Sequence, residues 1–233
     1  MCKELYLDLL KRSLLDIIYE EETTHTTNGT YWPKRAFTMI GRKRLDNIQH
    51  CVESVIANDV QGDLIETGVW RGGAVIFMQG ILKAYNITDR KVFVADSFQG
   101  LPAPNTEKYP IDKNSTMHTI DYLRVDVDQV KHNFEKYALL DTNVVFLKGW
   151  FKDTLTNSMI DKIAVLRLDG DLYESTWDSL TALYHKVQKN GFVIIDDYNW
   201  VNCRTAVEDF RKLHNIHDPI VIIDAWGAYW KKS

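Results

Sequence analysis

The sequence predicts an α/β protein with a mainly parallel, seven-stranded sheet and helices on both of its faces. From residue 63 onward, short runs suited to β-strands alternate with helix-length stretches, a pattern typical of β-α-β units. The last two strand-like runs are separated by a single residue, so no crossover helix fits between them and they are predicted to pair as an antiparallel edge hairpin. The chain has 233 residues, 45% of them hydrophobic, and is long enough to bury a core as one domain.

The first part of the chain lies outside this alternation and is predicted to be helical. Apolar residues recur at helical spacing over residues 4–20, which predicts an amphipathic helix with one buried face. Residues 23–33 are polar and are predicted to form a loop. A second helix is expected over residues 41–57. The single domain therefore divides into an N-terminal helical segment, residues 1–60, and a sheet-forming part, residues 61–233.

The sheet-forming part is predicted to contain seven strands and four helices. The strands are expected at residues 63–67, 91–95, 143–147, 163–168, 191–195, 220–224 and 226–230. The helices are expected at residues 72–85, 127–139, 174–189 and 201–213. Asp126 and Gln129, three residues apart, are predicted to cap the second of these helices. The connection at residues 97–125 contains three prolines and is too long for an ordinary turn, which makes it a candidate binding loop.

Composition excludes several classes of protein. The net charge of -4 and a pI near 6.0 argue against a nucleic-acid partner, which normally requires a basic face. The three cysteines, Cys2, Cys51 and Cys203, are too few and too widely spaced for a disulfide framework or a zinc site. The first residues do not resemble a signal peptide, and no apolar run is long enough to cross a membrane. We therefore expect a cytoplasmic protein.

Acidic residues follow two of the predicted strands at the point where each strand ends. Asp169 and Asp171 come after the fourth strand, and Asp196 and Asp197 come after the fifth. The carboxyl ends of neighbouring parallel strands form the rim where ligands bind, so these side chains are expected to converge. A single aspartate here is more often a turn former or helix cap. Several clustered carboxylates repel one another unless a cation lies between them, and oxygen ligands favour Mg²⁺, Ca²⁺ or Mn²⁺.

Three further segments are candidates for binding a nucleoside cofactor. The first strand runs into a glycine-rich turn that contains Gly68, although the spacing matches neither a dinucleotide fingerprint nor a P-loop, and tight packing is an equal explanation. Asp96 ends the second strand, where nucleoside-binding α/β folds bind ribose hydroxyls. Trp150 and Phe151 follow the third strand and are expected either to stack on adenine or to pack in the core.

These segments resemble one known family, the macrocin-type (TylF/MycF) O-methyltransferases, which depend on S-adenosylmethionine and Mg²⁺. The resemblance covers about residues 31–230. It is carried by residues 66–73, 95–102, 148–155, 166–176 and 191–198. Residues 38–41 and 44–47 also match the lid that covers the cofactor in that family.

The resemblance implies a Rossmann-like class I methyltransferase fold with an N-terminal helical lid. It implies a sugar hydroxyl of a glycosylated natural product as acceptor, and a homo-oligomer, a dimer or a tetramer, is expected as well. Mg²⁺ would be held by Asp169, Asp196 and Asp197, with Asp169 as general base and Asp171 in support. The residues expected to bind the cofactor are Met39, Glu66, Thr67, Gly68, Asp96, Ser97, Trp150 and Phe151.

Two other functions compete with this interpretation. Asp169-Gly170-Asp171 is a D-x-D sequence, which metal-dependent glycosyltransferases use to bind a nucleotide-sugar diphosphate. A diphosphate site requires basic residues, however, whereas Glu66 at the glycine-rich turn would repel phosphate and attract a sulfonium ion. The second alternative is a binding module without activity, which the intact acidic cluster disfavours.

Overall fold

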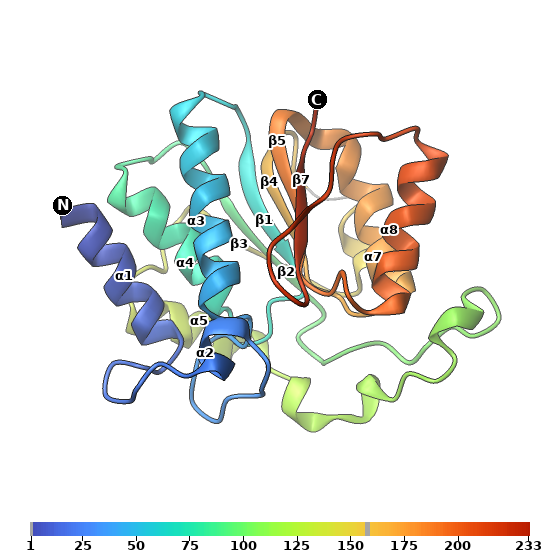
Figure 1. The fold of residues 1–233 in the computed structure, drawn as a ribbon, viewed down its shortest axis with the longest axis horizontal. Helices are drawn as coiled ribbons and strands as arrows, with labels where there is room; N and C mark the ends of the chain where they lie inside the picture. The colour runs from blue at the N-terminus through green and yellow to red at the C-terminus, as the bar shows by residue number, and fades with distance from the viewer. Residues whose placement is uncertain (1, 157–158) are drawn as a thin grey trace.

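The computed structural model describes residues 2–156 and 159–233 and contains one seven-stranded sheet (Figure 1). The strand order is β3-β2-β1-β4-β5-β7-β6, in which β1 to β5 are parallel and β7 runs antiparallel to both of its neighbours. The predicted mainly parallel sheet with an antiparallel edge pair is confirmed. The strands are β1 (Asp63–Thr67), β2 (Val92–Asp96), β3 (Val144–Lys148), β4 (Ile163–Leu168), β5 (Val187–Ile195), β6 (Val221–Ile222) and β7 (Ala228–Lys231).

Helices cover both faces of this sheet (Figure 1). The α-helices are α1 (Cys2–Leu14), α2 (Thr24–Asn28), α3 (Gly41–Ala57), α4 (Gly73–Ala84), α5 (Val127–Lys136), α6 (Phe151–Thr154), α7 (Tyr173–Leu183) and α8 (Val201–Leu213). On one face α1, α3, α4 and α5 share a hydrophobic core with the sheet, and on the other face α6, α7 and α8 share a second core. Successive strand residues such as Leu64 and Ile65 enter opposite cores, because side chains alternate across a strand.

The N-terminal segment differs from its prediction at two points. The first helix ends at Leu14 instead of residue 20, because Asp16 adopts a left-handed conformation (φ 58°) and the Ile17 N–H turns back to the carbonyl of Arg12. The predicted loop contains the short helix α2, whose N-cap Thr23 exchanges side-chain hydrogen bonds with the third helical residue. The helix predicted over residues 41–57 is confirmed as α3, and it packs directly against β4 and β5.

In the second half, one helix prediction is confirmed and another is wrong at its end. Asp126 caps α5 by accepting the backbone N–H groups of Asp128 and Gln129. The helix predicted over residues 174–189 ends at Leu183, because Val187 already pairs with β4 in the sheet. Pairing with a neighbouring strand therefore overrides the helical pattern of the sequence at this point.

The three cysteines are distributed between the surface and the two cores. Cys2 is exposed on α1, whereas Cys51 on α3 and Cys203 on α8 are buried in the cores on opposite faces of the sheet. Burial raises the pKa of both buried thiols. In the described residues, every helix is too short or too polar to cross a membrane.

Candidate active site

A cavity of about 360 Å³ opens over the carboxyl ends of the central strands. Its floor is formed by the ends of β1, β2, β4 and β5, its roof by residues 29–32 and 38–40, and one wall by residues 100–103 of the long connection. We call residues 23–40, which include α2, the lid. Thr67 does not line the cavity, because its side chain is buried within β1. The predicted site residues that do line it are Met39, Glu66, Gly68, Asp96, Ser97, Trp150, Phe151, Asp169, Asp196 and Asp197.

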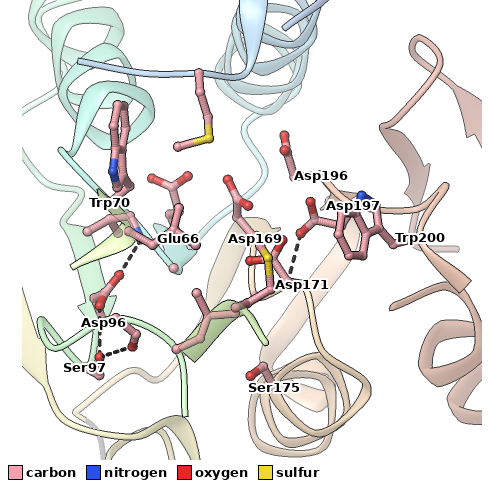
Figure 2. Close-up of a pocket in the computed structure, with 18 of the residues that line it drawn as sticks. Glu66, Trp70, Asp96, Ser97, Asp169, Asp171, Ser175, Asp196, Asp197 and Trp200 are labelled. Atoms are coloured by element: carbon pink, nitrogen blue, oxygen red, sulfur yellow. Dashed lines mark hydrogen bonds between the residues drawn. The ribbon is translucent and has the colours of Figure 1, made fainter. Parts of the chain in front are cut away.

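Three carboxylates from two neighbouring strand ends meet in the cavity. Asp169, Asp196 and Asp197 each offer an oxygen atom, and these oxygens lie within 4.8 Å of one another. The backbone fixes this arrangement, since the N–H of Asp196 donates to the carbonyl of Leu168 at 2.9 Å. Figure 2 shows Glu66, Asp169 and Asp197 in a row between the Asp96–Ser97 pair and Trp200. The convergence predicted from the sequence is present in the fold.

The cluster holds its protons more tightly than free carboxylates do. Burial, followed by repulsion from Asp196, raises the pKa of Asp169 to about 6. Burial and the charges of its neighbours raise the pKa of Asp171 to about 7 and that of Asp197 well above its ordinary value. A divalent cation can replace these protons and remove the repulsion, so the donor set fits Mg²⁺.

Asp171 supports the cluster through its backbone. It has a left-handed conformation (φ 59°), which asparagine and aspartate tolerate better than most residues. In this conformation its N–H donates to Oδ2 of Asp197 at 3.1 Å. The three-carboxylate cluster does not include its side chain. The structure therefore brings Asp171 to the edge of the predicted metal site.

Two buried arginines, which the sequence analysis missed, neutralise part of the cluster. Arg167 on β4 is fully buried and pairs with Glu66, with Asp196 and, at 2.9 Å, with Asp169. Arg44 on α3 pairs with Asp196. The position of Arg167 inside a buried apolar strand was a usable signal, because a charge in such a strand requires buried partners.

Glu66 is suited to meet a ligand that donates hydrogen bonds or carries positive charge. It is 1% exposed, and its Oε1 pairs with Arg167. Its Oε2 is buried and has no hydrogen-bond partner among the described residues. Burial raises the pKa of Glu66 to about 8, so a neighbouring cation would favour its charged form. A buried acceptor without a donor indicates a missing hydrogen-bond donor, and an ammonium group of a bound ligand would fit.

Asp96 organises the turns beside the cavity. Its Oδ2 accepts the N–H of Val69 at 2.8 Å, and its Oδ1 accepts the N–H of Phe98 at 2.7 Å. Each carboxylate oxygen has a second lone pair, so Asp96 can still accept hydroxyl groups of a ribose. Trp150 and Phe151 line the cavity as predicted, and Phe151 also packs against the core formed with α7 and α8.

Gly68 allows the ends of β1 and β4 to touch. Its φ of 87° lies in the region that favours glycine, and a Cβ atom there would lie 1.7 Å from the carbonyl oxygen of Asp169. Any side chain at this position would therefore displace Asp169. Gly68 therefore serves tight packing, which was one of the two explanations of the glycine-rich turn. The packing is between the ends of β1 and β4, and both ends line the cavity.

Aromatic side chains flank the cavity on several sides. Trp32 in the lid stacks on Tyr122 of the long connection, with ring centroids 5.2 Å apart and planes 1° apart. Tyr122 also contacts Trp70 at 5.4 Å between centroids. Trp200, at the start of α8, and Trp226, in the turn before β7, add two more aromatic surfaces to the lining. These rings offer flat apolar surfaces beside the carboxylate cluster.

Comparisons with known proteins match the chain to one family. The model of the macrocin O-methyltransferase (TylF) family matches residues 21–232. Demethyldecarbamoylnovobiocin O-methyltransferase of Streptomyces niveus is 49% identical, over 98% of this chain and 94% of its own length. Mycinamicin III 3''-O-methyltransferase of Micromonospora griseorubida is 47% identical, over 99% of this chain and 97% of its own.

Solved structures show the same fold. The structure of the O-methyltransferase NovP has a TM-score of 0.97 and 49% identity, and the match covers 99% of both chains. The calicheamicin methyltransferase CalS11 shares the fold alone, with a TM-score of 0.68, 18% identity and coverage of 98% of this chain and 91% of its own. The predicted Rossmann-like methyltransferase fold is confirmed.

Proposed function

Because the chain belongs to the macrocin O-methyltransferase (TylF) family and is an S-adenosylmethionine-dependent O-methyltransferase, we propose that it methylates a sugar hydroxyl of a glycosylated natural product with the help of Mg²⁺. The observation that supports the Mg²⁺ part is the meeting of Asp169, Asp196 and Asp197 in one cavity that Glu66 and Asp96 also line.

Asp169 is the proposed general base. Arg167 holds its Oδ2 at 2.9 Å, while its Oδ1 has no hydrogen bond from the described residues. This free oxygen can accept the hydroxyl proton of an acceptor that lies over the strand ends. When bound, Mg²⁺ would supply Lewis-acid stabilisation of the negative charge that develops on the hydroxyl oxygen. The fixed carboxylate orients the proton transfer, so that oxygen, methyl group and sulfur can align.

The cofactor is proposed to lie between the ends of β1, β2 and β3. Glu66 would accept a hydrogen bond from its amino group or face its positive charge, and Asp96 would accept its ribose hydroxyls. Ser97 lines the same region, with Trp150 and Phe151 placed for the adenine and Met39 covering the cofactor from the lid.

The glycosyltransferase interpretation is set aside, since the family transfers methyl groups. The charges at the carboxylate cluster point the same way. Both arginines that reach the cluster, Arg44 and Arg167, already pair with carboxylates, so neither is available to a diphosphate.

A glycoside acceptor suits the remaining walls. Trp32, Trp200 and Trp226 present aromatic faces, on which the C–H side of a sugar and an apolar aglycone can pack. The two relatives described above are named for novobiocin-type and mycinamicin acceptors, which supports a glycosylated natural product. We also infer a cytoplasmic location and a dimer or tetramer, which cell fractionation and light scattering would test.

The acceptor class is tested by methyl transfer from labelled S-adenosylmethionine to a panel of glycosylated natural products and their matching aglycones, with Mg²⁺ or with a chelator. We expect label on glycosides alone, and its loss with the chelator. Label on an aglycone, or on no glycoside of a broad panel, would contradict the acceptor class. Undiminished transfer in the chelator would contradict the role of Mg²⁺.

A further inference from the structure

Arg44 connects the lid to the cluster of carboxylates. It belongs to α3, and its side chain is 5% exposed. One nitrogen of its guanidinium, Nη1, pairs with Oδ2 of Asp196, and Nε pairs with Asp224 at 3.1 Å. Nη2 donates to the backbone carbonyls of Asn28, at 3.4 Å, and Gly29, at 3.1 Å. One side chain therefore bonds to the end of β5, to the β6–β7 turn and to the end of α2 in the lid.

Two glycines enclose this side chain. A Cβ atom on Gly29, which has a φ of 59°, would lie 2.3 Å from Nη2 of Arg44. A Cβ atom on Gly227, in the β6–β7 turn, would lie 3.0 Å from Cδ of Arg44. Asp224 accepts the N–H of Gly227 at 2.8 Å and so fixes that turn. The arginine has little room to move independently of the lid and the turn.

Asp196 depends on two arginines for its orientation. Its Oδ1 pairs with Arg167 and its Oδ2 pairs with Arg44. Charges of alternating sign thus follow one another across the ends of three strands, through α3 and into the β6–β7 turn. The row consists of Glu66, Arg167, Asp196, Arg44 and Asp224. Charge-assisted hydrogen bonds in a buried setting are strong, and removing one partner leaves the other uncompensated.

We propose that Arg44 is a positioning residue that couples closure of the lid to the orientation of Asp196. It holds the lid turn at Asn28 and Gly29 down towards the cavity while Asp196, together with Asp224, orients its guanidinium. The consequence for catalysis rests on the proposed role of Asp196 as a metal ligand. The coupling itself is a property of the fold and is measurable without metal, cofactor or turnover.

The test is a double-mutant cycle read by hydrogen exchange in the full-length, metal-free protein. The N–H groups of Gly29 and Thr30 both donate to the carbonyl of His25, so their exchange reports opening of the lid turn. We expect Arg44→Met to speed this exchange about tenfold, as the loss of one charge-assisted bond would do. Asp196→Asn is also expected to speed this exchange, although Asp196 follows β5 and lies outside the lid, and to add nothing in the Arg44→Met background.

Matched controls come from neighbouring positions. Asp197→Asn alters the adjacent carboxylate, which does not contact Arg44, and should leave exchange in the lid unchanged. Arg42→Met removes an arginine of the same helix that pairs with Asp8 and Glu22, and Asp196→Asn should still speed exchange in that background. Arg44→Lys keeps the charge and should restore part of the protection lost in Arg44→Met.

Two results would overturn the proposal. One is an Asp196→Asn variant whose lid exchanges at the wild-type rate, and the other is additivity of the two substitutions in the double variant. Should Arg44→Met not fold, Gly227→Ala provides the same test. The added Cβ would push against Cδ of Arg44 and displace its side chain, while every charge of the protein stays the same. Gly227→Ala is expected to speed lid exchange a few-fold, and no change would count against coupling. Failure of methyl transfer to glycosides would leave the cycle unaffected, so the two proposals fail separately.

Discussion

The two halves of the cavity floor satisfy their carboxylates in different ways. On the proposed cofactor side, both oxygens of Asp96 accept backbone N–H groups, so the fold itself orients this carboxylate. On the proposed metal side, carboxylates at the ends of β4 and β5 face each other and two buried arginines. Backbone donors are fixed by the fold, whereas the second arrangement leaves six carboxylates for two guanidiniums. The six are Glu66, Asp169, Asp171, Asp196, Asp197 and Asp224.

This difference explains why the two halves should respond differently to ligands. The cofactor half is organised before anything binds, so a substitution there should alter affinity. The proposed metal half has fewer positive than negative groups while no cation is bound, so substitutions and pH changes there should alter turnover and stability.

The largest effect is expected for Asp169→Asn. The amide keeps the shape and can offer an oxygen to the metal, but it cannot accept the hydroxyl proton. Turnover should fall by about 10²–10⁴, since general-base removal typically costs that much. The affinity for S-adenosylmethionine, measured by calorimetry, should change little. A variant with near-wild-type kcat would remove Asp169 from its proposed role.

Asp171→Asn, two residues further along the chain, is the matched comparison for Asp169→Asn. The hydrogen bond that supports Asp197 comes from the backbone N–H of Asp171, and asparagine keeps both this bond and the left-handed conformation. We therefore expect a loss of only a few-fold in kcat, smaller than for Asp169→Asn. The reverse order of effects in steady-state assays would place the base on Asp171.

A smaller effect, on affinity alone, is expected on the cofactor side. Asp96→Asn retains one acceptor oxygen but loses the charge and one acceptor, so binding of S-adenosylmethionine should weaken by about 1.5–3 kcal/mol. Calorimetric titration would measure this change, and a melting curve would confirm that the variant is folded. Unchanged affinity would exclude Asp96 from the cofactor site.

The smallest effect is a pH-dependent stabilisation by Mg²⁺. In the fold the pKa of Asp169 rises from 3.8 to about 6, that of Asp171 from 3.8 to about 7, and that of Glu66 from 4.5 to about 8. The metal-free folded chain therefore holds protons that the unfolded chain releases. Without metal, these groups favour folding below their ordinary pKa values, and this contribution is lost as pH rises towards the raised ones. Mg²⁺ competes with the same protons, so it should stabilise more at high pH.

Melting curves with excess Mg²⁺ and with a chelator would measure this. The gain in Tm from Mg²⁺ should be larger by a few degrees at about pH 8 than at about pH 5.5, given that about 1 kcal/mol shifts the Tm of such a domain by about 2–4 °C. Asp169→Asn should reduce the gain. A gain that is equal at both pH values would show that the carboxyl protons and the cation do not compete.

The fold could largely be predicted from the sequence because, in most segments, the local hydrophobic pattern agrees with the way the strands pair in the sheet. The helix over residues 41–57 and the strand over residues 63–67 have the predicted bounds, and both carry a clear hydrophobic pattern. The errors arise where local pattern and tertiary pairing conflict. Residues 187–189 look helical alone, but Val187 joins β5, and α2 is too short for its pattern to be visible.

The site was predictable to the extent that it depends on strand ends. Asp169 and Asp197 follow apolar strands directly or nearly so, and parallel pairing brings them together. The ion pairs of Arg44 were harder to predict from the sequence, since its partners Asp196 and Asp224 lie 152 and 180 residues further along the chain. A pairing over that separation depends on how α3 lies on the sheet, which no local pattern encodes.

The distribution of the cysteines gives each face of the sheet a natural reporter. A thiol reagent added to the folded protein should modify Cys2 and leave the other two intact. Modification of Cys51 then requires opening of the layer that contains α3, and modification of Cys203 requires opening of the layer that contains α8. In a Cys2→Ser background, the relative labelling rates of these two thiols would tell whether the two layers separate from the sheet together or one before the other.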